Sequence, residues 1–405
     1  MNFDEMMSFF QKHNYSTYER DNYDHFLEKM KFDFPIKSIH ITGSNGKGST
    51  ANFLYNAYLS NNYKVGLYTS PFLEDVTEMI SVNGKHISKD EYVALFNEFK
   101  DKFEKFGLSS FEMQTYIAFE YFLRQSLDLV VIEVGMGGFI DATNVIDNPL
   151  LAIITNISLE HTAYLGRSIS EIAYNKAGII KEDTPVLVGK VDDSAMFAIR
   201  EYAKDMDAPI YVVDDFHNEH LEGNKVVFDY YPFKNVKLST KAFYQCANAS
   251  LALEAINLLK EELPFDEAKV KEGMEKDILP CRLEYIKDNL ILDGGHNPDG
   301  INHLCETLGK IESRPIHVVF ASFRDKNIEN MLIPLSNMAV DVTLTTFDHP
   351  RARGEEEYFL YLGDYQFEAD YLKLIKDKLN EFPDDVVLVT GSLAFVGRVK
   401  QELKL

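Results

Sequence analysis

The sequence predicts an α/β protein with mostly parallel sheets, in which an N-terminal phosphate-loop domain precedes a smaller C-terminal α/β domain. Two observations predict this fold class. Short apolar segments alternate with longer segments of helical periodicity, and the apolar segments are continuous, as in strands that are buried on both faces. The length of 405 residues is ample for more than one buried core.

The expected strands fall into two series. The first comprises residues 37–42, 64–69, 129–134, 151–156, 185–188 and 209–213, and the second comprises 290–292, 316–321, 342–347 and 386–390. Residues 214–240 contain short polar and aromatic segments, which we interpret as a β excursion. Ser168 and Glu171 have the spacing of a capping box that opens the helix carrying Lys176.

Composition limits the partners. The formal net charge of -23 disfavours binding to nucleic acid or to an anionic membrane. The three cysteines form no CxxC pair, so we expect isolated thiols in a reducing compartment. The first residues do not resemble a signal peptide, and no apolar segment approaches membrane-spanning length. A cytoplasmic protein is expected. Pro280 would end a helix, and we therefore expect domains at 1–280 and 281–405.

Residues 43–50, Gly-Ser-Asn-Gly-Lys-Gly-Ser-Thr, follow an expected strand and open an expected helix. The N–H groups of such a turn, the helix N-terminus and a lysine can surround a phosphate chain, and a hydroxyl can bind its Mg²⁺. The usual pattern has glycine at position 41 and Ser or Thr at position 48, where this chain has Ile41 and Gly48. A tight strand–helix connection is the plainer alternative. The order of elements favours nucleotide binding through Asn45, Gly46, Lys47, Gly48, Ser49 and Thr50.

Polar residues also follow other expected strands. Ser70 comes after 64–69, His161 comes after 151–156, and Glu133 lies inside an apolar strand, where an unpaired charge would be costly. A hydroxyl, a carboxylate and an imidazole beside a triphosphate predict an Mg²⁺ site. Alternatively, Glu133 pairs with a lysine and His161 caps a helix.

A series of motifs then appears in order along the chain. They are Gly-Ser-Asn-Gly-Lys-Gly-Ser-Thr at 43–50, Thr-Ser-Pro at 69–71, Glu-Val-Gly-Met-Gly-Gly at 133–138, Asp-Ala-Thr-Asn at 141–144, Leu-Glu-His-Thr at 159–162, Asn-Lys-Ala-Gly-Ile-Ile-Lys at 175–181, Asp-Gly-Gly-His-Asn-Pro at 293–298 and Gly-Ser-Leu at 391–393. With these motifs the chain resembles the folylpolyglutamate synthase family, often bifunctional with dihydrofolate synthase, within the Mur ligase superfamily. The resemblance covers residues 18–398.

The resemblance implies an ATP-dependent ligase that joins glutamate to a folate, through an acyl phosphate, in a Mur-ligase-like central domain and a Rossmann-like C-terminal domain. It also implies a monomer that needs Mg²⁺, with two ions expected. Whether dihydropteroate is a second acceptor stays open.

The same resemblance assigns roles to residues. Lys47, Lys176, His296 and Ser392 are implied to be catalytic, and Asn248, Arg282 and Asp293 to bind ATP together with the phosphate loop. Ser70, Glu133, His161 and Lys176 are the implied metal ligands, with Lys176 carried as a carbamate; an unmodified lysine paired with Glu133 or a phosphate is the alternative. The pterin side is implied to comprise Tyr18, Glu19, Arg20, Phe111, Glu112, Ile140, Asp141 and Ala142, although Glu112 could equally be an ordinary exposed helix residue.

Four positions depart from the family pattern. Phe139 and Met79 stand where the family usually has arginine, Cys281 where it has glycine, and Gly295 where it has alanine. We expect Met79 and Phe139 to flank the acceptor, so the loss of two guanidinium groups would weaken recognition of a carboxylate. Two alternatives therefore remain: a related ligase that uses another acid, and a nucleotide-binding regulator without catalysis.

Overall fold

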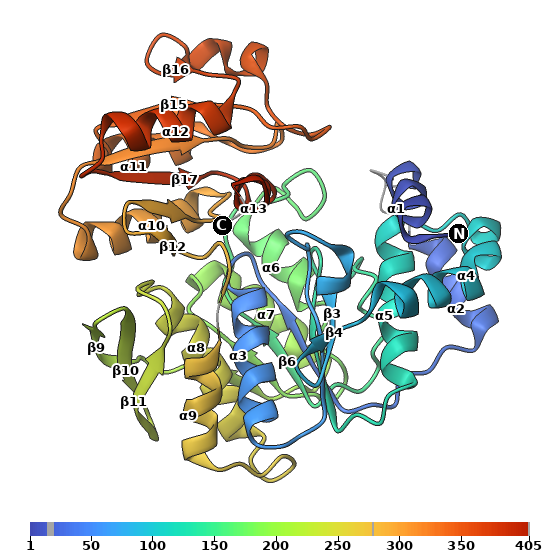
Figure 1. The fold of residues 1–405 in the computed structure, drawn as a ribbon. Coiled ribbons are helices and arrows are strands. Elements are labelled where there is room, and N and C mark those ends of the chain that lie inside the picture. Colours follow the sequence, from blue (N-terminus) through green and yellow to red (C-terminus); the bar gives the residue numbers. More distant parts are fainter. Residues whose placement is uncertain (14–19, 278, 404–405) are drawn as a thin grey trace. The chain divides into compact units, whose positions relative to one another are not determined.

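The structure is a computed structural model of the chain, and it describes residues 1–13, 20–277 and 279–403. Its internal contacts divide the chain into two compact units. Unit 1 comprises Met1–His217, Phe228–Val236 and Ala247–Asp277, and unit 2 comprises Asn218–Val227, Lys237–Cys246 and Ile278–Leu405. Both units contain a parallel-rich sheet with helices, so the predicted fold class is confirmed (Figure 1).

Unit 1 contains an eight-stranded sheet with the order β4-β3-β2-β5-β1-β6-β7-β8. Its strands from β2 to β8 in this order pair in parallel, whereas β3 and β4 are antiparallel additions at one edge. The strands are β1 (Ser38–Thr42), β2 (Val65–Tyr68), β3 (Ile80–Val82), β4 (Lys85–His86), β5 (Leu129–Glu133), β6 (Leu151–Ile154), β7 (Val186–Val188) and β8 (Ile210–Val212).

Helices cover this sheet in groups. Apolar side chains of α1, α2, α4 and α5 share one core cluster with β2 and β5, and those of α6 and α7 share another with β6 and β7. The capping box predicted at Ser168 and Glu171 is present at the start of α6. The helices are α1 (Phe3–Lys12), α2 (Asp21–Met30), α3 (Lys47–Ser60), α4 (Lys89–Phe106), α5 (Ser110–Leu123), α6 (Ile169–Ala177), α7 (Asp193–Asp205), α8 (Gln245–Leu258) and α9 (Glu267–Lys276), with a 3₁₀ helix, η1 (Val76–Met79).

The predicted β excursion is also confirmed. It forms a separate three-stranded sheet with the order β11-β10-β9, made of β9 (His217–Glu222), β10 (Lys225–Tyr230) and β11 (Phe233–Leu238).

Unit 2 contains a six-stranded sheet with the order β12-β13-β17-β14-β15-β16, in which β12 alone is antiparallel. Buried aliphatic side chains on the central strands and on α10 and α11 form its core. The elements are β12 (Glu284–Lys287), β13 (Leu290–Leu292), α10 (Pro298–Ile311), β14 (Ile316–Phe320), α11 (Glu329–Met338), β15 (Asp341–Leu344), η2 (Glu355–Tyr361), β16 (Gln366–Phe367), α12 (Tyr371–Glu381), β17 (Val386–Thr390) and α13 (Leu393–Glu402).

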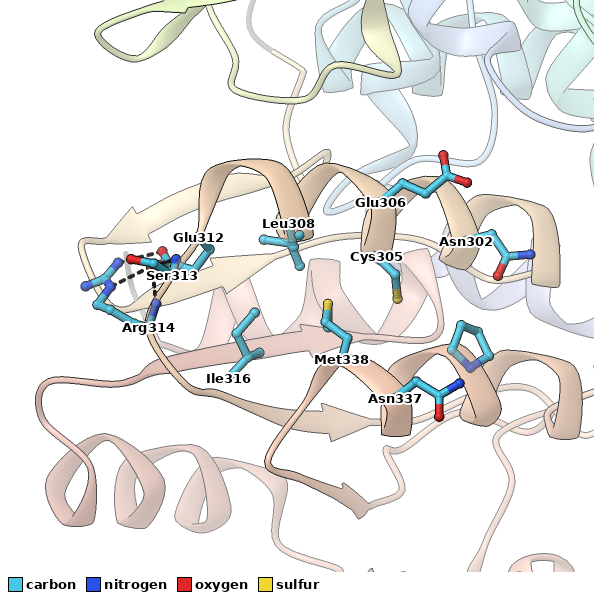
Figure 2. A pocket seen from close by; sticks show the side chains of 12 residues that line it. Asn302, Cys305, Glu306, Leu308, Glu312, Ser313, Arg314, Ile316, Asn337 and Met338 are labelled. Carbon is cyan, nitrogen blue, oxygen red and sulfur yellow. Dashed lines mark hydrogen bonds and ion pairs between the residues drawn. The ribbon is translucent and has the colours of Figure 1, made fainter.

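An open groove of about 600 Å³ lies between α10 and α11 of unit 2 (Figure 2). Arg314 closes one end through ion pairs with Glu312 and Asp288. Cys305 also lines the groove, and burial raises the pKa of its thiol to about 12, so the thiol stays protonated at neutral pH. In the part of the chain that the structure describes, no helix is both long enough and apolar enough to cross a membrane.

Candidate active site

The phosphate loop, residues 43–48, connects β1 to α3 at the carboxyl edge of the sheet. Gly46 has a φ of +83°, and a Cβ built on it would lie 2.1 Å from Asn248 Oδ1, so both backbone and space require glycine. The first N–H groups of α3 have no carbonyl partner within the helix, which makes this end a natural anion site. Lys47 Nζ donates to the carbonyl oxygens of Gly43 (2.9 Å) and Ser44 (3.4 Å), inside the same loop.

Two hydroxyls follow Lys47, and both are buried. Thr50 Oγ1 donates to the Asn248 carbonyl oxygen at 3.3 Å, whereas Ser49 lies one residue closer to the loop. Asn248 of α8 therefore contacts the loop at Gly46 and the helix at Thr50. This placement puts a predicted nucleotide-contacting residue directly against the phosphate loop.

Glu133 ends β5 and faces the start of α3. Its side chain is buried, and Oε2 accepts the Ser70 N–H at 3.0 Å. A Cβ built on Gly48 would lie 3.2 Å from Glu133 Oε2. The carboxylate thus occupies the space beside position 48, which accounts for glycine where the usual phosphate-loop pattern has Ser or Thr. The proposed metal ligands Ser70 and Glu133 are neighbours, as predicted from their strand ends.

Lys176 of α6 is buried and pairs with Glu160. Its Nζ lies 2.8 Å from Glu160 Oε1 and 2.8 Å from the Gly43 carbonyl oxygen. Burial lowers the pKa of Lys176, and Glu160 offsets part of that effect. Burial by itself would raise the pKa of Glu160, but the charges of Lys176 and Lys47 outweigh it and hold this pKa at about 2. As an unmodified lysine, Lys176 therefore pairs with Glu160, whereas the partners that we expect for it are Glu133 or a phosphate.

Glu160 is a residue of the site that sequence reasoning missed. The motif Leu-Glu-His-Thr points to His161 alone, and polar residues close by on both sides of Glu160 give no sign that this carboxylate is buried.

His161 follows β6 and has a φ of +45°, the left-handed region. The strand order β2-β5-β1-β6 places the segments of Ser70, Glu133 and His161 on both sides of the phosphate loop. Over residues 1–13, 20–277 and 279–403, no three His, Cys, Asp or Glu side chains are grouped to hold a metal. A site built on Ser70, Glu133 and His161 would therefore depend on phosphate oxygens and water, which is the usual arrangement for Mg²⁺.

Hydrogen bonds to Asp141 and from Arg20 hold the loop of residues 136–144. Asp141 is buried, and its carboxylate accepts hydrogen bonds from Met136 N (2.7 Å), Thr143 N (3.0 Å) and Thr143 Oγ1 (2.6 Å). Arg20 donates to the carbonyl oxygens of Phe139 (3.0 Å) and Asn144 (2.9 Å). Arg20 and Asp141, two of the charged residues that the resemblance places at the pterin, thus stabilise this loop.

The other residues predicted to lie at the pterin have different surroundings from one another. The ring of Phe111 packs on Gly135, where a Cβ would lie 2.3 Å from Phe111 Cζ, and Glu112 accepts the Ser109 N–H and hydroxyl as a capping residue of α5. Ala142 is buried in an aromatic core cluster, and Ile140 packs beside Met136. Tyr18 and Glu19 lie outside the described residues.

Unit 2 has a second cluster at the carboxyl edge of its sheet. Asp293 follows β13, is buried, and accepts hydrogen bonds from Leu283 N, Gly295 N and the Tyr244 hydroxyl, each at 2.8 Å. Burial raises the pKa of Asp293, and the charge of Arg282 lowers it. The predicted ATP residues Arg282 and Asp293 are thus electrostatically coupled.

His296 and Ser392 belong to the two loops that meet beside this cluster. The loops are joined by a hydrogen bond from Gly391 N to the Gly295 carbonyl oxygen (3.0 Å). His296 Nδ1 lies 3.1 Å from the Gly294 carbonyl oxygen, and Ser392 is buried at the N-terminus of α13.

Met79 and Phe139, the two positions that we expect to flank the acceptor, have different surroundings. The side chain of Met79 is 2% exposed and belongs to the aromatic core cluster of unit 1. Phe139 packs between Tyr174 and Tyr202, with ring centroids 5.4 and 5.2 Å away. Cys281 has a φ of +57°, a conformation that favours the glycine of the family pattern, so this departure strains the backbone as well as adding a side chain.

The fold and the loop geometry define a Mur-type ligase. Residues 41–255 match the Mur ligase middle domain, and residues 281–393 match the Mur ligase, glutamate ligase domain.

Proteins that are similar over almost the full chain show which kind of Mur-type ligase this is. The chain is 34% identical to the dihydrofolate synthase/folylpolyglutamate synthase of Bacillus subtilis (strain 168), over 91% of each chain, and 32% identical to the folylpolyglutamate synthase of Lacticaseibacillus casei, over 90% of this chain and 89% of that one. It superposes on the ADP complex of Mycobacterium tuberculosis folylpolyglutamate synthase with a TM-score of 0.91, at 27% identity and with 100% and 98% coverage. The chain belongs to the folylpolyglutamate synthase/dihydrofolate synthase family.

Proposed function

We propose that the protein is an ATP-dependent ligase that adds L-glutamate to a folate, with dihydropteroate as a second acceptor to be tested. The observation that carries the proposal is the buried Glu133 carboxylate facing the start of a phosphate-loop helix whose lysine lies inside the loop. Family membership supports it, since relatives are named as folylpolyglutamate or dihydrofolate synthases, and one solved relative is a complex with AMPPCP and folate.

A carboxylate is a poor electrophile, and transfer of the ATP γ-phosphoryl group to it makes an acyl phosphate that an amine can attack. The protein's task is to position the groups and to offset the charge on the phosphoryl oxygens. Lys47 Nζ would exchange its two loop carbonyls for the transferred phosphoryl group, and the N–H groups opening α3 would bind the remaining phosphate oxygens.

Mg²⁺ would neutralise phosphate charge when bound, and Ser70, Glu133 and His161 would hold it. Their oxygen and imidazole atoms fit such an ion in combination with phosphate. Lys176 as an ammonium does not fit as a ligand, because it is a cation paired with Glu160. As a carbamate it would become an anion, and its lowered pKa favours the neutral amine that this modification requires.

In unit 2, we assign Arg282 and Asp293 to ATP binding, and His296 and Ser392 to the use of glutamate. Asp293 is held by three donors, so its role would be to fix the 281–283 segment that carries Arg282. Asn248 would complete the nucleotide site in unit 1.

The deciding experiment incubates the protein with ATP, Mg²⁺ and labelled glutamate, in parallel with dihydropteroate and with tetrahydrofolate. We expect a labelled product with at least one acceptor, and Lys47→Ala should nearly abolish it. Lys204→Ala, which removes an exposed lysine of α7, is the matched control and should leave activity unchanged.

Other outcomes identify the alternatives. ATP hydrolysis with another acid but with no folate would indicate a related ligase. Nucleotide binding without turnover of any acid would indicate a regulator.

A further inference from the structure

The phosphate loop is tied to the segment that follows β6 by side chains for which no role was assigned. Asn45 N–H donates to Asn156 Oδ1 at 2.6 Å, and Thr155 Oγ1 donates to the Asn45 carbonyl oxygen at 2.6 Å. Both backbone groups of Asn45 are therefore bonded to side chains of this segment. The orientation of Asn45 in the loop is fixed from outside the loop.

The neighbouring residue of the loop, Ser44, is held by backbone groups of the same segment. Ser44 N–H donates to the Asn156 carbonyl oxygen (2.9 Å), Ser158 N–H donates to Ser44 Oγ (2.9 Å), and Ser44 Oγ donates to the Ser158 carbonyl oxygen (3.2 Å). We call Thr155, Asn156 and Ser158 the β6 brace. The brace packs so closely that a Cβ built on Gly43 would lie 1.8 Å from Thr155 Oγ1.

The brace accounts for the unusual loop sequence. Ile41, at the position where the usual pattern begins with glycine, is fully buried inside β1, so the loop starts two residues later and is shorter. A short loop has fewer N–H groups of its own to set its shape. Side chains of the brace supply the missing constraints.

We propose that Asn156 and Thr155 are positioning residues for phosphoryl transfer, which hold the Asn45 peptide so that the N–H groups opening α3 and the Lys47 ammonium face the phosphate chain. This inference rests on the proposed function. The brace leads directly into Glu160 and His161, so it also keeps the phosphate loop in register with the Lys176 ion pair.

The test compares two ligands that differ in phosphate. Calorimetric titration with ADP and with adenosine is carried out on wild type, Asn156→Ala and Thr155→Val. Each variant removes one bond to Asn45, and a lost hydrogen bond of ordinary strength predicts about tenfold weaker binding of ADP. Adenosine binding should be unchanged, and KM for ATP should rise while KM for glutamate does not.

Thr155→Ser is the matched control, because it keeps the hydroxyl and should retain wild-type ADP affinity. Thr155→Val is nearly isosteric, so it keeps the test valid if Asn156→Ala does not fold. Unchanged ADP affinity in Thr155→Val, or an equal loss for adenosine and ADP, would overturn the inference. A wild-type protein that binds neither ligand would instead count against the proposed function.

Discussion

Asp277, which directly follows α9, is a buried carboxyl group that should limit the stability of unit 1 above neutral pH. Helices α9 and α3 lie side by side (Figure 1), and a Cβ on Gly273 would lie 2.5 Å from the Asn56 carbonyl oxygen. Asn56 Nδ2 of α3 donates to Asp277 Oδ1 at 2.9 Å. Oδ2 is buried and has no hydrogen-bond partner among the described residues. Apart from Lys47 at its first residue, α3 carries no charged side chain that could compensate.

Burial raises the pKa of Asp277 from 3.8 to about 7, and the hydrogen bond from Asn56 offsets only part of this. Between about pH 4 and pH 7, the Asp277 carboxyl group is therefore protonated in the folded protein and ionised in the unfolded chain. The free energy of unfolding should fall as pH rises through this window and level off above it. A rise from 3.8 to about 7 corresponds to about 4 kcal/mol.

Asp277→Asn mimics the protonated carboxyl and removes the titration. Urea unfolding, followed by circular dichroism between about pH 5 and pH 8, should show that the variant's advantage over wild type grows with pH, by about 2–3 kcal/mol over this range. Asp266→Asn, at the exposed N-cap of the same helix, is the control and should give only a small difference, because asparagine caps a helix about as well as aspartate. A pH-independent difference at Asp277 would refute the reasoning.

Four further outcomes follow from particular contacts. Gly46→Ala should lose ADP binding in a titration, because its Cβ would meet Asn248 and its φ is positive. Lys176 should give a carbamate signal by NMR after exposure to isotopically labelled bicarbonate, and Lys176→Ala should regain part of its lost activity when a short carboxylic acid is added. Gly309→Ala should raise the free energy of unfolding by about 1 kcal/mol, measured with urea, since Gly309 lines the groove between α10 and α11 and its Cβ would meet no atom within 4 Å. Met79→Arg should destabilise the fold by several kcal/mol in the same assay, because it buries an unpaired charge. Phe139→Arg should fold, and it should lower KM for the acceptor acid only if position 139 reaches the acceptor.

The central strands were predictable because each is a continuous apolar segment between helices, and the sheet geometry follows from that pattern. The expected strand at 151–156 is too long: β6 ends at Ile154, and the side chains of Thr155 and Asn156 bond the phosphate loop. Strands β3, β4, β12 and β16 are not predicted, because they are short; β4, β12 and β16 also lie at sheet edges, where apolar patterning is weak. The capping box of α6 was predictable because its signal lies within four residues.

The sequence indicates site chemistry where it lies in consecutive residues, and it does not reveal contacts between residues that are far apart along the chain. The phosphate loop could be read from consecutive residues, but the Glu160–Lys176 ion pair joins residues 16 positions apart, and Asn45 and Asn156 are 111 positions apart. Asp141 and Arg20 are placed at the pterin by the resemblance to the family, which says nothing of their partners within this chain. Their hydrogen bonds to the 136–144 loop became visible only once the chain was folded.

The departures from common patterns have different physical meanings, which the sequence alone could not separate. Gly48 leaves room for the Glu133 carboxylate, and Ile41 is a buried strand residue because the loop begins at Gly43. Met79 is a core side chain, so its difference from the family pattern says nothing direct about the acceptor. Phe139 alone remains half-buried near the 140–144 segment, where Arg20 already binds the backbone carbonyl of the same residue. The choice of acceptor acid is therefore best tested at position 139, with the phosphate loop and its brace left intact.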